Sequence, residues 1–153
     1  MMHELLKAGM VAGCVLALSG ALAPTMANKL DDAKALDQKA ANLVAAEGAK
    51  AFPQISDPKG GFVQGELYVV VLDQKGVVRA HPNPGIVGVN MWDSTDPDGV
   101  KFTQDAIKIA DTTGSGWQTY KFTNPVDRKI ETKRTWVQKA GDFVVMCGAY
   151  SKQ

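Results

Sequence analysis

The spacing of hydrophobic and polar positions changes along the chain, and each spacing predicts a different kind of element. Over residues 29–51, apolar and small side chains recur every three or four positions, with charged residues between them. That period is typical of one long amphipathic helix. Pro53 is expected to end the helix, and residues 54–61, which contain one proline and two glycines, are expected to form a loop.

A β-hairpin is predicted next. Residues 67–72 are apolar, aromatic or β-branched, and the sequence Asp73-Gln74-Lys75-Gly76 separates them from a second short strand at 77–80. A strand, a turn containing glycine and another strand indicate antiparallel pairing.

Residues 81–98 are expected to form an irregular but structured loop, because prolines and glycines interrupt any regular pattern there. Apolar residues from Phe102 to Ala110 then predict a short helix, with Asp98 as its N-cap and Gly114 as its stop.

Three further strands are predicted at 117–122, 133–139 and 142–150, joined by turns at 124–127 and 140–141. The whole order indicates the α+β class. We expect one domain with an antiparallel sheet of five to six strands, a long N-terminal helix, and a loop-plus-helix insertion over the sheet.

Residues 1–27 are predicted to be a signal peptide. Lys7 precedes an apolar run at 8–23, and the small residues Thr25 and Ala27 favour a cut after Ala27. Residues 28–153 would then form the mature domain, in the periplasm or outside the cell. After Ala27 no apolar stretch approaches the length of a membrane span.

Two alternatives remain open for this segment. It could stay as a membrane anchor, although its apolar run is short for a span. It could also be a lipoprotein signal acylated at Cys14, although the run continues beyond that cysteine. If Cys14 leaves with the signal peptide, Cys147 has no intramolecular disulfide partner, and its apolar surroundings in sequence predict a buried, inert thiol.

A series of short motifs accompanies the predicted order of elements. They are, along the chain, Gly61-Phe62, Glu66-Leu67-Tyr68-Val69, Asp73, Gly76, Ala80-His81-Pro82, Gly88-Val89-Asn90, Asp96-Pro97-Asp98-Gly99, Gly114-Ser115-Gly116-Trp117, Tyr120, Asn124-Pro125, Lys133, Thr135-Trp136-Val137 and Gly148-Ala149-Tyr150. In this order and spacing the chain resembles the single Cache domains of bacterial extracytoplasmic sensors, whose sheet is PAS-like.

The resemblance implies a function. Such domains hold a small polar molecule, often a short carboxylate, between the sheet and the insertion, and they ordinarily sit between two membrane spans of a chemoreceptor or kinase. Without a second span, the bound state here would have to be read by another protein, such as a membrane receptor or a kinase. No role on nucleic acid is expected, because 17 Lys and Arg nearly balance 16 Asp and Glu.

A carboxylate pocket needs cationic donors, aligned hydrogen-bonding groups and aromatic walls. Arg79 and His81 leave the hairpin where side chains can turn over the sheet, and the resemblance favours Lys133 as a carboxylate partner. Lys133 shares a strand face with Thr135, whereas Trp136 lies on the other face, and the sequence leaves open which face lines the pocket. The candidate ligand-binding residues are Arg79, His81, Trp92, Tyr120, Lys133 and Trp136.

Each candidate also has an ordinary structural explanation. Arg79 could be a solvated strand end, His81 a loop anchor and Lys133 a surface lysine. The aromatic residues Trp92 and Tyr120 could simply belong to the core.

Metal binding and catalysis are not expected. Ser94, Asp96, Asp98, Gly99 and Asp105 approach the spacing of an EF-hand, but the first and last ligands are replaced and Pro97 stiffens the loop, which favours a helix-capping turn. Residues 28–153 contain one histidine and no nucleophile, haem or nucleotide motif, so we expect neither an enzyme nor a cofactor.

Two hypotheses follow. The first is an exported sensor domain that binds a short organic acid or a similar metabolite and presents the bound state to a partner. The alternative is a structural or interaction protein that keeps the Cache fold but has no ligand pocket.

Overall fold

The computed structural model describes residue 20 and residues 22–152 of the 153-residue chain. Most of the predicted signal segment, including Cys14, lies outside the described residues. The predicted cut after Ala27 falls within the first turn of the first helix and stays a prediction. Within the described part of the chain, none of the helices combines the length and the apolar character that crossing a membrane requires.

The predicted N-terminal helix is present but ends differently. α1 (Met26–Glu47) begins after Thr25, whose hydroxyl accepts the Asn28 N–H at 3.3 Å. A 3₁₀ turn, η1 (Gly48–Ala51), and a short helix, α2 (Phe52–Ser56), follow. The expected stop at Pro53 is wrong, because this proline lies in the first turn of α2, where its missing N–H has no partner to lose.

The sheet has six antiparallel strands, as the α+β expectation required. They are β1 (Val63–Gln64), β2 (Leu67–Asp73), β3 (Val78–Ala80), β4 (Ser115–Thr123), β5 (Ile130–Ala140) and β6 (Phe143–Ser151). Their order is β1-β2-β6-β5-β4, with β3 also paired to β2. In the β2–β3 turn the Asp73 carboxylate accepts the N–H groups of Lys75 and Val77 at 2.9 and 3.0 Å, which explains the predicted hairpin.

The insertion consists of an irregular stretch followed by α3 (Phe102–Thr113), which ends as predicted at Gly114 with φ of 78°. Asp98 does not cap this helix, because Lys101 occupies the N-cap position. Asp96 has the organising role instead. Its carboxylate accepts the N–H groups of Asp98 and Val100, both at 2.9 Å, and that of Lys121 in β4 at 2.8 Å.

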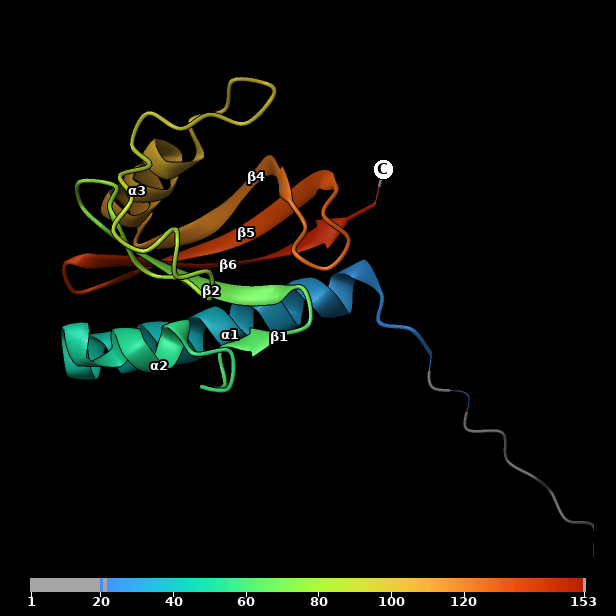
Figure 1. Cartoon of the computed structure of the whole chain (residues 1–153), viewed down its shortest axis with the longest axis horizontal. Helices are drawn as coiled ribbons and strands as arrows, with labels where there is room; N and C mark the ends of the chain where they lie inside the picture. The colour runs from blue at the N-terminus through green and yellow to red at the C-terminus, as the bar shows by residue number, and fades with distance from the viewer. Residues whose placement is uncertain (1–19, 21, 153) are drawn as a thin grey trace, which may run out of the picture.

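The two faces of the sheet carry different layers. Figure 1 shows α1 and α2 against one face, and α3 with its preceding loop over the other. The alternation of side chains along each strand separates two apolar cores accordingly. Val69 and Cys147 pack toward α1, whereas Leu72, Val137 and Met146 pack toward α3. Cys147 is buried, as predicted.

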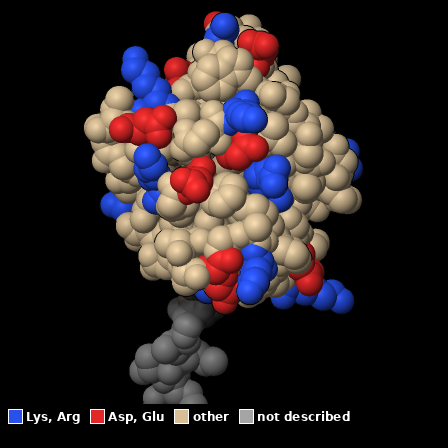
Figure 2. Space-filling model, turned by 90° about the vertical axis from the view of Figure 1, so that its left-hand side faces the viewer, with Lys and Arg blue, Asp and Glu red and all other residues tan. Residues whose placement is uncertain are grey.

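Charged side chains of both signs are mixed on the surface. On the face of the molecule seen in Figure 2, Lys and Arg alternate with Asp and Glu, and neither sign forms a continuous patch. This distribution agrees with the formal net charge of +1 and gives that face no field that would attract a polyanion.

A buried carboxyl group interrupts the apolar layer under α1. The Asp37 side chain is 0% exposed, and neither of its oxygens has a hydrogen-bond partner among the described residues. Burial raises the pKa of Asp37 well above its ordinary value. The carboxyl group therefore resists ionisation in the folded protein.

Replacing Asp37 by asparagine should stabilise the protein increasingly as the pH rises. The folded state keeps the Asp37 proton above the pH at which the unfolded chain releases it, so the free energy of unfolding of the wild type falls as pH rises above about 4. Asparagine has no such proton. We expect a gain of about 1–3 kcal/mol near neutral pH in urea unfolding.

The matched control is Asp32→Asn, at an exposed position of the same helix, which should change stability by less than about 0.5 kcal/mol. Equal stability of Asp37→Asn and the wild type at neutral pH would contradict the conclusion that the buried Asp37 carboxyl group has no partner.

Candidate ligand-binding site

An internal cavity lies between the sheet and the insertion. Its volume is about 30 Å³, and residues of β2, β4, β5 and β6 form its floor while Ile86, Met91 and Phe102 cover it. Five side chains with polar groups line it among mostly apolar neighbours: Tyr68, His81, Thr103, Tyr120 and Lys133. A space of this size holds about one or two water molecules.

Lys133 is the central residue of the cavity. It is 3% exposed, and no ion pair joins its ammonium group to a carboxylate in the described part of the chain. Glu131, two residues earlier on the same face of β5, accepts a hydrogen bond from Asn124 instead. A buried cation without a counterion is costly, and the cavity lies directly beside it.

A glycine lets Lys133 reach across the sheet. Its Nζ donates to the hydroxyl of Tyr68 on β2 at 3.0 Å, although β6 lies between β5 and β2. At the crossing point β6 has Gly148, where an added Cβ would lie 2.9 Å from Lys133 Cε and even closer to the hydroxyl of Thr135. Any larger residue at this position would obstruct the lysine.

A directed chain of hydrogen bonds continues from the ammonium group. The Tyr150 hydroxyl donates to the Thr123 carbonyl at 3.0 Å, which uses its only proton. Tyr68 must therefore be the donor in the 3.0 Å contact between the two tyrosine hydroxyls, and its oxygen accepts from Lys133. The chain fixes both tyrosines and occupies one of the three N–H donors of the ammonium.

Aromatic rings surround the rest of the ammonium group. Lys133 Nζ lies 4.1 Å from the ring centre of Tyr68, 5.0 Å from that of Tyr150 and 5.5 Å from that of Phe122. Burial lowers the pKa of Lys133, but the surrounding tyrosine hydroxyls outweigh burial and raise it above the ordinary lysine value. Lys133 is therefore charged at neutral pH.

His81 faces the same cavity as a neutral side chain. Its Nδ1 accepts the Asn83 N–H at 2.9 Å, so the ring proton is on Nε2, which can donate to a ligand. Burial, followed by the charge of Lys133, lowers the pKa of His81 to about 4. The site thus offers one permanent cation and one neutral donor.

An open groove continues outward from the cavity. It has a volume of about 570 Å³ and shares Tyr68, His81, Ile86 and Phe122 with the cavity. At its outer part it is lined by Pro125 and Arg128, from the connection between β4 and β5. The groove and the cavity of Lys133 therefore lie side by side, separated by side chains that line both.

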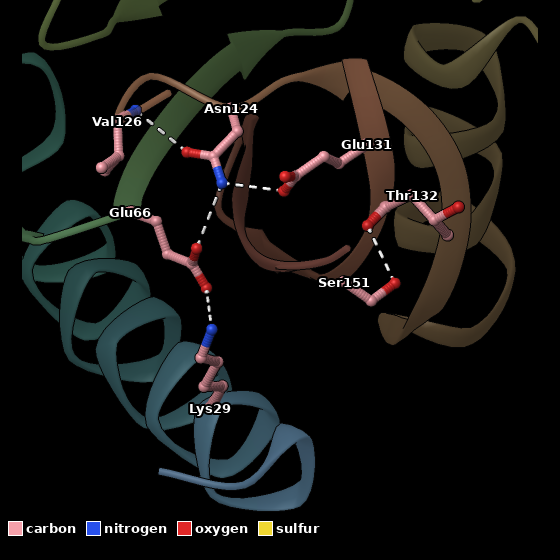
Figure 3. A network of polar contacts seen from close by, with 7 residues as sticks. All are labelled: Lys29, Glu66, Asn124, Val126, Glu131, Thr132 and Ser151. Atoms are coloured by element: carbon pink, nitrogen blue, oxygen red, sulfur yellow. Dashed lines mark hydrogen bonds and ion pairs between the residues drawn. The ribbon is translucent and has the colours of Figure 1, made fainter. Parts of the chain in front are cut away.

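A polar network fixes that connection. Figure 3 shows Asn124 at its centre, where the side-chain amide donates to Glu131 at 2.9 Å and to Glu66 at 3.2 Å while its oxygen accepts the Val126 N–H. Lys29 of α1 donates to the other oxygen of Glu66 at 2.9 Å. The start of α1, the residue before β2 and the β4–β5 connection are thus held together.

The comparisons with known proteins decide the family. The family model described as Single Cache domain 2 matches residues 26–153. The chain belongs to the single Cache domain family. No curated protein matches this Cache domain.

Solved structures show the same fold. A structure titled as the periplasmic sensor domain of a chemotaxis protein is 22% identical, with a TM-score of 0.70 over 85% of this chain and all of that one. A methyl-accepting chemotaxis protein from Vibrio parahaemolyticus is 16% identical, with a TM-score of 0.67 over 78% of this chain and 86% of that one. A Cache chemosensory domain, titled for its carboxylic acid recognition, is 19% identical, with a TM-score of 0.66 over 80% of this chain and 92% of that one.

The structure brings three of the six predicted ligand residues of this Cache domain together. His81, Tyr120 and Lys133 line the cavity, which also answers the question of which face of β5 is turned toward it. Tyr120 stacks on Phe102 at 4.8 Å, and burial raises the pKa of its hydroxyl. Their part in binding stays a prediction.

The other three lie elsewhere. Arg79 points outward between two buried strand neighbours and pairs with Asp73 at 3.7 Å. Trp136 lies on the α1 face, where Lys34 Nζ is 4.2 Å from its ring centre. Trp92 is 39% exposed and lines a separate shallow depression beside the β2–β3 turn. Strand alternation places the first two away from the cavity, and loop geometry places the third.

Sequence reasoning missed the residues that hold Lys133 in place. Tyr150 is the direct partner of Lys133 in the β5–β6 pairing, and counting outward from the predicted turn at 140–141 would have found it. Tyr68 and Gly148 were noted only as motif residues. Gly148 is on the neighbouring strand β6, opposite Thr135, whereas the contact of Tyr68 with Lys133 crosses β6, and no local pattern reveals it.

No cluster of potential metal ligands occurs among residues 22–152, so the weak EF-hand spacing around Asp96 has no geometric support there. The Asp96 carboxylate is occupied by backbone N–H groups.

His81 should make the protein less stable in acid. The unfolded chain binds a proton at this histidine below about pH 6.5, whereas the folded protein binds it only near pH 4. The contribution of neutral His81 to the free energy of unfolding is therefore complete above pH 6.5 and is lost as the pH falls toward 4. We expect the free energy of unfolding of the wild type to fall by about 3 kcal/mol more than that of His81→Gln over this range. Urea unfolding of both proteins at several pH values measures the difference, and parallel pH profiles would contradict the assignment.

Gly148→Ala should displace Lys133 and Thr135 and destabilise the protein by about 1–3 kcal/mol or more. Gly116→Ala is the matched control, since this glycine is also in a strand but its added Cβ meets chiefly one side-chain methyl group, Cγ2 of Ile109, at 3.0 Å. Thermal unfolding of both variants tests whether Gly148 is needed to make room for Lys133 and Thr135. Equal losses of stability in the two variants would show that it is not.

Proposed function

We propose that this Cache domain is an extracytoplasmic sensor module that binds a small carboxylate beside Lys133 and presents the bound state to a membrane receptor or kinase. The observation that carries the proposal is a buried ammonium group that faces a cavity without a carboxylate partner within the described part of the chain. An anionic ligand supplies the missing counterion, and it gains charge-assisted hydrogen bonds in surroundings that exclude water.

The donors around the cavity match a carboxylate group. The ammonium of Lys133 has two N–H donors beyond the one given to Tyr68, and the neutral His81 ring has an Nε2–H. Aromatic and apolar side chains line the remaining cavity wall. The family match and the fold shared with periplasmic sensor domains support the same role and an extracytoplasmic location. Sensing, with no chemical conversion, needs nothing further from this site.

The small enclosed volume favours the alternative of an interaction protein without a ligand. About 30 Å³ does not hold a whole organic acid. Two features favour binding nevertheless: Ile86 belongs to the irregular insertion that covers the cavity, and the groove already opens beside His81. A ligand can place its carboxylate at Lys133 and leave its remaining atoms toward the groove.

Thermal unfolding with and without ligand tests the proposal. Acetate, propionate, pyruvate and lactate are compared with acetamide and propionamide, which have similar shapes but no charge. At about one hundred times the dissociation constant a bound acid adds about 2.7 kcal/mol, a rise in Tm of roughly 5–10 °C. The acids should raise Tm, and the amides should not.

Lys133→Met separates binding from stability. It removes a buried uncompensated charge, so the free variant should be at least as stable as the wild type, yet it should lose the acid-induced rise in Tm. Lys139→Met, at an exposed lysine of the same strand, is the matched control and should keep that rise. The proposal is wrong if Lys133→Met still responds to the acids, or if no acid stabilises the wild type.

A further inference from the structure

Arg128 occupies an unusual backbone conformation at the mouth of the groove. Its φ is 65°, and it is the one described residue other than glycine with a positive φ. Arginine seldom adopts this left-handed region, which disfavours side chains with a Cβ. Such a conformation persists only where the surroundings impose it, and it often marks a functional position.

The surrounding turn imposes the conformation through its hydrogen bonds. The Arg128 N–H donates to the Asn124 carbonyl at 2.9 Å, and the Asn124 N–H donates to the Lys129 carbonyl at 2.8 Å. The Asp127 carboxylate accepts the Lys129 N–H at 3.0 Å. Asn124 itself is fixed by Glu66 and Glu131, as Figure 3 shows. The turn therefore holds Arg128 at a defined place on the groove.

Arg128 is an exposed residue without a carboxylate partner in the described part of the chain. It lines the groove. The groove that leads from Arg128 to the cavity of Lys133 is walled mainly by apolar side chains, among them Val63, Ile86 and Phe122. The adjoining cavity and groove thus have a cation at the buried end, apolar side chains between, and a second cation at the open end.

We propose that the ligand of this site is a dicarboxylate with an apolar spacer, bound by Lys133 through one carboxylate and by Arg128 through the other. The proposal rests on the function proposed above and extends it to the open end of the groove. The planar guanidinium of arginine can bind a carboxylate through two parallel hydrogen bonds, and the apolar walls favour a hydrocarbon spacer over a hydroxylated one. An acid with one carboxylate would leave Arg128 unused.

Isothermal titration calorimetry on the purified protein tests this inference with paired acids of equal chain length. Succinate, glutarate, adipate and pimelate are compared with butyrate, valerate, hexanoate and heptanoate. At the best-fitting length, the wild type should bind the dicarboxylate at least about tenfold more tightly than its monocarboxylate partner. Equal affinities at every length would overturn the proposal.

Two variants of Arg128 separate charge from folding. Arg128→Gln should abolish the preference for dicarboxylates and leave monocarboxylate affinity within about twofold. Arg128→Gly should do the same, and because glycine adopts a positive φ readily, its Tm should equal or exceed that of the wild type. Lys129→Gln makes the same change in net charge next to the groove and should keep the preference.

The outcomes for the two proposals are distinct. If Arg128→Gln retains the preference while Lys133→Met loses all binding, the role of Arg128 is refuted and the carboxylate site at Lys133 stands. If no acid of either series binds the wild type but acetate, propionate, pyruvate or lactate raises its Tm, only the dicarboxylate proposal fails; if none of these acids acts either, both proposals fail.

Discussion

The organisation of the site depends on one constraint, the burial of the Lys133 ammonium without a carboxylate nearby among the described residues. A charge in this position persists only if other groups stabilise it. Here a tyrosine hydroxyl accepts one N–H, and three aromatic rings lie within 4.1 to 5.5 Å of the nitrogen. These contacts are individually weaker than an ion pair, so an anion beside the ammonium group would stabilise its charge further.

That constraint explains the residue types found at three positions on two strands. Gly148 on β6 leaves room for the aliphatic part of the lysine side chain, and the Tyr68 hydroxyl on β2 accepts the hydrogen bond from its ammonium group. Tyr150 accepts a hydrogen bond from Tyr68 and donates one to a backbone carbonyl of β4. None of the three would be required by an apolar core at this place. A sheet face that serves only for packing would place larger apolar residues here, as the same sheet does toward α1 with Val69 and Val145.

The sequence allowed the fold to be predicted well because its signals were local. The apolar run of β2, the glycines that end turns and helices, and the periodic spacing of α1 each depend on a few neighbouring residues. The errors arose where two local rules compete. Pro53 can end a helix or begin one. Asp98 was expected to cap α3, but the neighbouring Asp96 fixes the loop before this helix through its bonds to the loop and to β4.

For the site, residue type identified His81, Tyr120 and Lys133. It equally suggested Arg79 and Trp136, whose side chains point away from the cavity because of strand alternation. The strained Arg128 gave no signal in the sequence, because its backbone is fixed by a hydrogen bond to Asn124. Asn124 is held in turn by Glu66 and Glu131, which lie far along the chain or across the hairpin.

The small enclosed volume and the uncompensated charge together describe how the free domain differs from a bound one. In the free state the insertion closes over Lys133 and leaves about 30 Å³, so the ammonium keeps little access to water. A ligand that reaches it must displace apolar side chains such as Ile86, which costs free energy, and must recover that cost from the charge it neutralises. Because only an anion recovers it, the closed cavity discriminates against neutral molecules of the same shape. Under the proposed function, the position of the insertion would then depend on occupancy, as a sensor domain requires.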